Sequence, residues 1–447
     1  MRIVQWTAIL LLFCLCDARL DFWNGKESTH NHNKVNDLNP NKFSPVIFIP
    51  GDGGSQVEAK LNKTSSLHYY CEKTADFFNI WLNPKLLVPL VIDCWIDNVK
   101  LTYDNKTRTT QNTPGVTIRI PGFGRSEVVE WLDPSITKSL AGAYFKDIAN
   151  ALVAKGYVRN VTLRGAPFDF RKAPNENQQW FVDLKQLVED TYTQGGEQRI
   201  TLLVHSMGGP MSLVFLQKQT KEWKDKYIAQ VISLAGAWAG SAKAIKVFAI
   251  GDDLGSFALS GSVLRAEQIT SPSLAWLMPS PHFWKSNEVL ATTHTKQYTM
   301  SNLNEFFDDI GYPQGWDMRQ DTLPFTDFTA PGVEVHCLYG EGMPTVERLN
   351  YKGDLKTTPT LVTGDGDGTV NARSLKSCER WSGTKAQRGK TIHSIELPGV
   401  DHMGILSDKR VVEYVLDLLV RNKTYDIEEN ERYDYRRQHQ LHHNWLN

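Results

Sequence analysis

The sequence lacks an excess of charge of either sign. Its 447 residues contain 49 Lys and Arg against 50 Asp and Glu, which gives a formal net charge of -1 at pH 7. Nucleic-acid binding depends on a basic surface, so this balance argues against a nucleic-acid partner. With 41% hydrophobic and 22% charged residues, the composition is that of an ordinary globular protein.

Long apolar runs are absent after the first residues. The start, MRIVQWTAILLLFCLCDA, combines Arg2, an apolar run to Cys16 and the small residue Ala18. This pattern is typical of a secretory signal peptide cut near Ala18, so we expect residues 1–18 to be removed. The run is too short to span a bilayer well. We therefore expect a soluble mature protein, and a retained signal anchor is the alternative.

Cysteine is also scarce, with six residues, two of which lie in the signal peptide. An even number in an oxidising compartment suggests two disulfides, with three possible connectivities. Proximity in the sequence favours Cys71–Cys94 and Cys337–Cys378. Four N-x-T sequons fit the same secretory route; they begin at Asn62, Asn105, Asn160 and Asn422.

Short apolar, β-branched segments alternate with helical patterns along most of the chain. Helical periodicity is clear at 137–157 and 178–192. Such alternation predicts a mostly parallel sheet with helices on both faces, an α/β fold. The expected strands are VIFI after Ser44 and the segments 161–165, 199–204, 229–236, 333–340, 359–364 and 393–399.

Two segments interrupt this alternation. Residues 66–105 are dense in aromatic and aliphatic side chains and contain the first cysteine pair, which predicts a small disulfide-stapled subdomain. Residues 240–330 mix helix and loop signals, which predicts a cap over the sheet. The remaining divisions are a polar leader at 19–44, a core at 45–65, 106–239 and 331–421, and a polar tail at 422–447.

The stretch ITLLVHSMGGPM, residues 200–211, places Ser206 directly after an apolar strand and before two glycines. A nucleophilic serine on a tight strand-to-helix turn has this setting, usually written G-x-S-x-G. Here Val204 replaces the first glycine. A plain strand-to-helix turn is therefore the alternative to a catalytic serine.

The order of residues along the chain favours the catalytic alternative, because α/β-hydrolases carry Ser, then an acid, then His. The strand at 359–364 runs into GDGDGTVN, which offers Asp365 and Asp367. The strand at 393–399 is followed by His402 on a loop, whereas His336 and His393 lie inside strands. A calcium loop would need further ligands that this spacing lacks. We expect neither a metal nor a cofactor.

An attacked carbonyl oxygen needs preorganised hydrogen-bond donors. The N–H of Met207, after the nucleophile, is one, and the PGDGG turn supplies Asp52 near the second. A carboxyl in an apolar cleft has a raised pKa. An ionised Asp52 would oppose a developing oxyanion, so we expect activity to favour acidic pH.

Eight stretches together resemble the lecithin:cholesterol acyltransferase family, from about Val46 to about Leu419. Aspartate at position 52 resembles the lysosomal branch, because the plasma branch has cysteine there. The resemblance implies an α/β-hydrolase fold with a cap domain and a disulfide-stapled membrane-binding subdomain. The stretches are PGDGGSQVEAKL, CEKTADFFNIWLN, DCWIDN, PGVTIRIPGFG, RGAPFDFRKAPNEN, HSMGG, GDGDGTVN and LPGVDH.

The resemblance also assigns roles to residues. It implies Ser206 as nucleophile, Asp367 rather than Asp365 as acid, His402 as base, and Asp52 with Met207 as the oxyanion hole. It implies the same two disulfides that proximity favours. The aromatic segment resembles the family's membrane-binding domain, with ordinary core packing as the alternative. Its candidate lipid-facing residues are Phe77, Phe78, Trp81, Leu86, Leu87 and Leu90.

The activity that the resemblance implies is calcium-independent cleavage of glycerophospholipid acyl esters through an acyl-serine. The acyl group would pass to water or to an alcohol such as ceramide, at a phospholipid membrane surface. The location would be the acidic lumen of the lysosome, outside the cell, or both. The alternatives are a secreted phosphatidylcholine–sterol acyltransferase and a non-catalytic lipid-binding protein.

Overall fold

The computed structural model describes residues 43–135, 142–255 and 259–421. The expected signal peptide, most of the polar leader, the tail and the sequon at Asn422 lie outside the described residues. No helix within the described ranges has the length and apolarity to cross a membrane.

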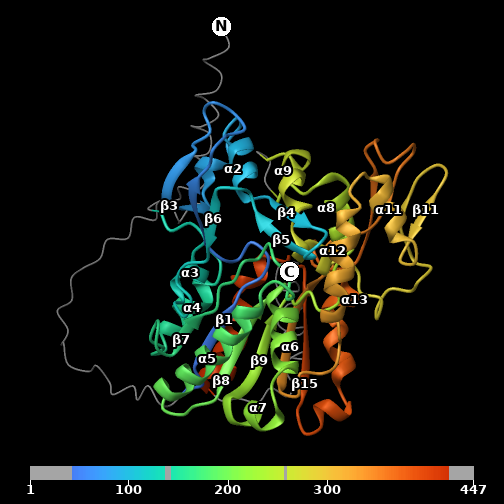
Figure 1. Ribbon diagram of the computed structural model, residues 1–447. Coiled ribbons are helices and arrows are strands. Elements are labelled where there is room, and N and C mark those ends of the chain that lie inside the picture. The colour runs from blue at the N-terminus through green and yellow to red at the C-terminus, as the bar shows by residue number, and fades with distance from the viewer. Residues whose placement is uncertain (1–42, 136–141, 256–258, 422–447) are drawn as a thin grey trace, which may run out of the picture. The chain divides into compact units, whose positions relative to one another are not determined.

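Six parallel strands form the central sheet, in the order β15-β12-β9-β8-β1-β7 (Figure 1). Each corresponds to a segment predicted from its apolar, β-branched residues, and every residue of β1 and β8 is buried. Burial on both faces explains why these strands read as continuous apolar runs rather than as alternating ones. Their bounds are β1 Val46–Ile49, β7 Leu163–Gly165, β8 Ile200–His205, β9 Ile228–Leu234, β12 Glu334–Glu341 and β15 Ile392–Pro398.

Helices connect these strands. The predicted helix at 178–192 is present as α5, Gln178–Gln194, whose buried residues recur at helical spacing. Of the predicted helix at 137–157, residues 137–141 lie outside the described residues, and the described part forms α4, Lys146–Val153. Just before α4, Ala143 bridges Trp131 in an extended pairing, so this described part of the predicted helix is not helical. The other helices of this part are α3 Glu127–Glu130, α6 Gly208–Gln217, α7 Lys221–Tyr227, α13 Ala372–Leu375 and α14 Lys409–Leu416.

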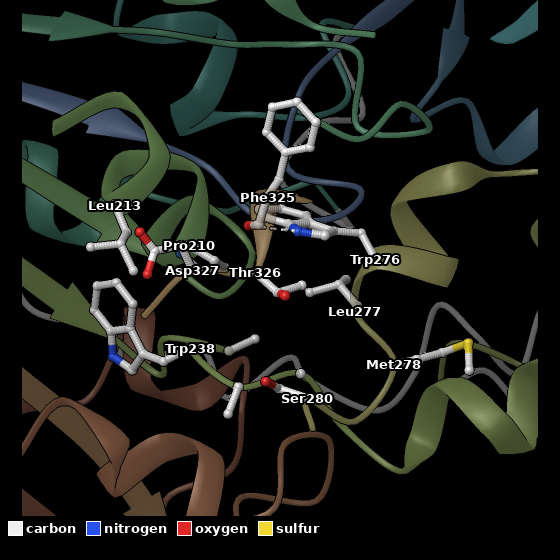
Figure 2. Close-up of a pocket in the computed structure, with 13 residues that line it drawn as sticks. Pro210, Leu213, Trp238, Trp276, Leu277, Met278, Ser280, Phe325, Thr326 and Asp327 are labelled. Atoms are coloured by element: carbon white, nitrogen blue, oxygen red, sulfur yellow. Dashed lines mark hydrogen bonds between the residues drawn. The ribbon is translucent and has the colours of Figure 1, made fainter. Parts of the chain in front are cut away.

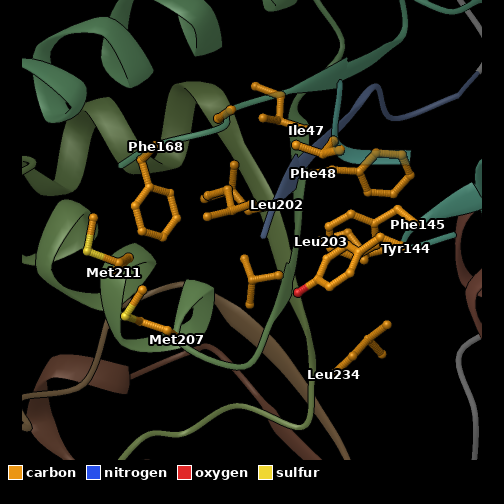
Figure 3. Packing of buried hydrophobic residues seen from close by; sticks show 14 of the residues in the cluster. Ile47, Phe48, Tyr144, Phe145, Phe168, Leu202, Leu203, Met207, Met211 and Leu234 are labelled. Carbon is orange, nitrogen blue, oxygen red and sulfur yellow. The ribbon is translucent and has the colours of Figure 1, made fainter. Parts of the chain in front are cut away.

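The core is packed from both sides of β1 and β8 (Figure 3). Phe145 stacks on Phe48 of β1, with ring centroids 4.6 Å apart. In Figure 3, Met211 of α6 and Phe168 lie on the other side of the strands. A parallel sheet covered by helices on both faces is the predicted α/β-hydrolase arrangement.

Both favoured disulfides are present, Cys71–Cys94 and Cys337–Cys378. The first lies in the predicted subdomain, where strand β3 is followed by a short helical turn and α2. However, β3 pairs with β2, and β2 pairs with β6, so two strands of this sheet lie outside 66–105. We therefore propose wider limits for this subdomain. Its elements are β2 Val57–Asn62, β3 Thr74–Trp81, η2 Pro84–Leu86, α2 Ile92–Val99, β4 Leu101–Asp104, β5 Thr109–Asn112 and β6 Val116–Arg119.

The segment predicted as a cap has its own hydrophobic cluster, which includes Phe248, Phe306 and Phe307. Two of its strands continue into a four-stranded sheet, β11-β10-β13-β14. The predicted strand at 359–364 is β14, and it belongs to this sheet rather than to the central one, because it pairs antiparallel with β13. The elements are α8 Lys243–Ile250, α9 Gly261–Gln268, α10 Pro272–Trp276, β10 Val289–Thr292, β11 Gln297–Thr299, α11 Leu303–Asp309, α12 Gln314–Thr322, β13 Thr345–Asn350 and β14 Thr360–Gly364.

Candidate active site

Ser206 lies on a sharp turn between β8 and α6. Its backbone φ is +54°, in the left-handed region that non-glycine residues seldom adopt. A Cβ at Gly208 would lie 2.4 Å from the carbonyl oxygen of Ile49, so only glycine lets α6 start this close to β1. The backbone is therefore strained at the position where a strand-to-helix turn would expose a nucleophilic hydroxyl.

Val204 does not disturb this turn. It is still part of β8, where it pairs with Ile49 and is completely buried. The close approach that requires glycine occurs at Gly51 instead, where a Cβ would lie 2.6 Å from the Cβ of Ser206. The turn therefore does not need a glycine at position 204, because Gly51 in the loop after β1 provides the space beside Ser206.

The three predicted side chains form one chain of hydrogen bonds. The Oγ of Ser206 lies 2.9 Å from Nε2 of His402, and Nδ1 of His402 lies 2.7 Å from Oδ2 of Asp367. Ser206 and His402 each keep 8% of their surface exposed, and Asp367 keeps 1%. This geometry suits proton transfer from the hydroxyl to the imidazole, with the carboxylate orienting the ring.

Asp367 is held for that purpose. Its Oδ1 accepts hydrogen bonds from the N–H groups of Val370, at 2.7 Å, and Thr369, at 3.0 Å. Burial alone would raise its pKa, but His402 and these amides outweigh burial and lower the pKa below its ordinary value. Asp365 is positioned differently, because its carboxylate accepts from the N–H of Gly342 at 2.7 Å.

The loop after β1 brings Asp52 to the same place, because β1 and β8 are parallel neighbours that end together. Desolvation by the surrounding protein raises the pKa of Asp52 to about 6, against the opposing effects of the Gly53 amide and Lys243. The residue as a whole is nevertheless exposed. Met207 precedes the first turn of α6, where backbone N–H groups have no partner inside the helix.

The arrangement of these side chains therefore suits acyl transfer through a serine. The sequence model described as "Lecithin:cholesterol acyltransferase" matches residues 77–328 and 324–409. The chain belongs to the lecithin:cholesterol acyltransferase family.

Relatives in this family include two differently named enzymes. "Lysosomal phospholipase A and acyltransferase" of Rattus norvegicus and that of Homo sapiens are each 42% identical over 381 residues, which cover 85% of this chain and 91% of the relative. "Phosphatidylcholine-sterol acyltransferase" of Mus musculus is 36% identical over 420 residues, which cover 93% of this chain and 94% of the relative.

Two residues at the site were missed by sequence reasoning. His205 is the last residue of β8. Its Nε2 lies 2.9 Å from the carbonyl oxygen of His402, and its Nδ1 lies 2.5 Å from the hydroxyl of Tyr144. That hydroxyl accepts from the N–H of Gly51 at 3.0 Å. Burial, with His402 adding to it, lowers the pKa of His205 to about 3, so the ring is neutral. His205 could have been noticed beside Ser206, but nothing local marked Tyr144.

Of the six predicted lipid-facing residues, five are partly buried and only Leu90 is exposed. Trp81 points inward, because its indole N–H donates to the carbonyl oxygen of Gly53 at 2.8 Å. Phe78, Leu86 and Leu87 are half-buried against the main core, and Phe77 lies under the guanidinium of Arg119. Leu90 is 73% exposed, and the segment has further exposed apolar side chains that the prediction omitted, namely Leu67, Tyr69, Tyr70 and Val88.

A small hollow lies behind α6, and Figure 2 shows its lining. Pro210 and Leu213 of α6 face Trp238, and the indole N–H of Trp276 donates to the carbonyl oxygen of Phe325 at 3.2 Å. Ser206, His402 and Asp52 do not line it. This hollow is therefore separate from the residues predicted to be catalytic.

A second carboxyl near Asp52 leads to a stability prediction. Burial raises the pKa of Glu267 in α9 to about 8; Arg171 opposes this rise, and Asp52 and Asp169 add to it. An unfolded glutamate titrates near ~4.3. Between these values the folded state holds a proton that the unfolded state has released, so stability falls as pH rises through this window. Glu267→Gln should therefore raise the free energy of unfolding at pH 7.5 by on the order of 2 kcal/mol.

At pH 4.5 the same substitution should change little, because the native carboxyl is already neutral there. Chemical denaturation at both pH values measures the difference. Glu72→Gln, at an exposed position, is the matched control and should have no such pH dependence. Equal effects of Glu267→Gln at both pH values would contradict the assignment.

Proposed function

We propose that this protein is a serine phospholipase A and O-acyltransferase that acts on glycerophospholipids in an acidic compartment. The observation that carries the proposal is the hydrogen-bonded series Ser206–His402–Asp367, in which Ser206 and His402 follow central strands and Asp367 follows β14 of the second sheet. Its support from comparison is the similarity to relatives named for lysosomal phospholipase A and acyltransferase activity.

In the first half-reaction, His402 takes the proton of the Ser206 hydroxyl as its oxygen attacks the ester carbonyl carbon. The resulting oxyanion accepts hydrogen bonds from the N–H of Met207 and from the loop that contains Asp52. Collapse breaks the ester bond, and the imidazolium of His402 returns the proton to the departing lysophospholipid. The acyl group remains on Ser206 as an ester.

In the second half-reaction, water or an alcohol replaces the lysophospholipid. His402 removes a proton from it, the new oxygen attacks the acyl-serine, and Ser206 leaves with the proton restored. Water yields a free fatty acid, and an alcohol such as ceramide yields its O-acyl ester. The nucleophile is a side-chain hydroxyl, so we propose that turnover is independent of calcium.

The proposed lipid contact is the disulfide-stapled subdomain. Its exposed apolar side chains, with Leu90 foremost, are the kind that a monomer leaves uncovered for a partner or a lipid surface. Trp81 connects this subdomain to the active site through its hydrogen bond with Gly53, next to Asp52. We propose that phospholipid enters along this side.

The proposed setting is the secretory route, ending in the lysosome or outside the cell. Asn62 and Asn105 are exposed and suited to carry glycans. The side chain of Asn160 is engaged, because Nδ2 donates to Glu127 and Oδ1 accepts from the N–H of Ser126. We therefore propose glycosylation at the first two sequons before the third.

The test is an assay on vesicles of phosphatidylcholine with an anionic phospholipid, at pH 5 and 7.4, with ceramide or cholesterol as acceptor. The proposal expects fatty acid and O-acylceramide at pH 5. Preferential formation of cholesteryl ester at pH 7.4 would instead support the sterol acyltransferase alternative. Vesicle binding without any lipid product would support the non-catalytic alternative.

The pKa of Asp52 predicts how the rate depends on pH. Below about 6 the carboxyl is mostly protonated and neutral, and above that value its charge opposes the oxyanion, so kcat/KM should fall as pH rises through about 6. Asp52→Asn should remove most of this fall, because the amide stays neutral. Profiles from pH 4 to 8 measure the effect. Asp76→Asn, with an almost fully exposed side chain, should keep the wild-type profile; an unchanged fall in Asp52→Asn would refute the role.

A further inference from the structure

Away from Ser206, the central sheet carries a second cluster of chemically active side chains. Glu334 and His336 lie near the start of β12, and His393 lies near the start of β15. Because the strands are parallel, this end of the sheet is opposite the one from which the loops with Ser206 and His402 leave. Nothing in the proposed acyl-transfer mechanism uses these three residues.

The strand register brings the three side chains to one face. His336 is the direct neighbour of His393 across the two strands, and Glu334 precedes His336 by two residues, so all three point the same way. The imidazole rings stack with centroids 4.3 Å apart and planes inclined by 7°. A ring nitrogen of each histidine and a carboxylate oxygen of Glu334 lie within 4.8 Å of one another.

Neighbouring groups orient two of these side chains. The hydroxyl of Tyr414 in α14 lies 2.8 Å from Nδ1 of His336, which leaves Nε2 for a ligand. The N–H of Thr391 donates to one carboxylate oxygen of Glu334 at 3.1 Å. The other oxygen of Glu334 lies 2.8 Å from Nε2 of His393. Hydrogen bonds to the far side of imidazole and carboxylate ligands are typical of metal sites, where they fix the tautomer and orientation.

We propose that Glu334, His336 and His393 bind a divalent transition-metal ion, with Zn²⁺ the first candidate. Two imidazoles and one carboxylate form a ligand set that zinc favours, and a water molecule would complete the tetrahedron. On binding, the ion would replace the present hydrogen bond between His393 and Glu334. This site is independent of the proposed acyl transfer.

The required rearrangement is small. Zinc–nitrogen and zinc–oxygen bonds of ~2.0–2.1 Å place tetrahedral ligand atoms ~3.3 Å apart, so the widest pair must approach by roughly 1.5 Å. His336 is buried, whereas the side chains of His393 and Glu334 are 19% and 30% exposed. The two more exposed side chains can rotate toward His336 and leave an opening for water. A bound ion would then join edge strand β15 to β12.

The experiment uses the untagged, full-length mature protein, freed of metal by chelation, at pH 7.5. Zinc binding is measured by calorimetry and by metal analysis after dialysis, and Co²⁺ is added as a spectroscopic probe. Other histidines of the chain, including His439, His442 and His443 of the tail, can bind zinc themselves. The measured quantity is therefore the one equivalent of zinc whose binding depends on Glu334, His336 and His393.

Glu334→Gln and His393→Gln should each lower zinc affinity at this equivalent by more than 100-fold, because each removes a direct ligand and removing even an indirect partner costs ~10–100-fold. Tyr414→Phe should lower it by about 10-fold while keeping the Co²⁺ spectrum. His294→Gln, an exposed histidine elsewhere, should change nothing. Zinc should also raise the melting temperature of the wild type more than that of Glu334→Gln.

Two results would overturn the proposal. One is equal zinc stoichiometry and affinity in the wild type, Glu334→Gln and His393→Gln, with melting curves that show all three folded. The other is an octahedral Co²⁺ spectrum that none of these substitutions alters. Either result would leave the cluster as a hydrogen-bonded His–Glu pair that packs beside His336.

Discussion

Ser206→Ala should lower kcat for phospholipid cleavage by about 10⁶-fold, the loss found when a serine nucleophile is removed from a triad. The loss corresponds to roughly 8 kcal/mol of transition-state stabilisation. Its physical cause is specific: alanine keeps the turn between β8 and α6 but has no oxygen to attack the carbonyl carbon. The vesicle assay at pH 5 measures the rate, and labelling by a fluorophosphonate should disappear in parallel.

Two further variants serve as controls for this prediction. Ser212→Ala removes a buried hydroxyl from α6, the helix that follows Ser206. This hydroxyl donates to the carbonyl oxygen of Gly209, and the variant should retain nearly full activity. The double variant Ser206→Ala/His402→Ala should be no slower than Ser206→Ala, because the two residues act as one unit. Retention of more than a few per cent of activity in folded Ser206→Ala would exclude an acyl-Ser206 intermediate.

Asp367→Asn should lower kcat by about 10⁴-fold, whereas Asp365→Asn should lower it by no more than about threefold. The hydrogen bonds give the reason. Because the amides of Thr369 and Val370 both donate to Oδ1 of Asp367, the amide oxygen of the asparagine should remain there. Its NH₂ group would then face Nδ1 of His402 and hold the ring in the tautomer with a proton on Nε2. That nitrogen could no longer accept the proton of Ser206.

Asp365 provides the matched control because it lies two residues away in the same loop. Its carboxylate accepts from the N–H of Gly342, whereas the imidazole of His402 is hydrogen-bonded to Asp367, so replacing Asp365 should cost about 1 kcal/mol of stability and little catalysis. Steady-state kcat of both variants, with thermal melting to show that each is folded, measures the contrast. A larger loss in Asp365→Asn would reverse the assignment of the acid.

The proposed acid preference depends on a different residue from the proposed triad. Asp52 lies on the loop after β1, the parallel neighbour of β8, while Asp367 follows the end of a strand in the second sheet. Replacing Asp52 should therefore change how kcat/KM depends on pH, and replacing Asp367 should lower the rate at every pH. The two substitutions test different parts of the same site.

Much of the fold could be predicted from the sequence because the information is local. The inner strands β1 and β8 are buried on both faces, and burial demands the runs VIFI and ITLLVH, which remain visible without a structure. The order of Ser206, the aspartates and His402 was equally readable, since each follows a strand. The choice between Asp365 and Asp367, however, came from family resemblance and not from spacing.

Only the tertiary structure decided features that depend on distant partners. The strand at 359–364 reads like any other, yet its pairing with β13 places it in the second sheet. Trp81 looked lipid-facing in the sequence, but a hydrogen bond to Gly53 turns it inward.

Composition and strand patterns thus determined an α/β fold and led to the proposal of a serine-based chemistry, because burial and chain order are visible in local sequence patterns. No local sequence pattern indicated three other features: the contact of Tyr144 with His205, the raised pKa of Glu267 and the stacked pair His336–His393. Each arises where segments far apart in the chain meet, and sheet pairing and packing alone fix which segments those are.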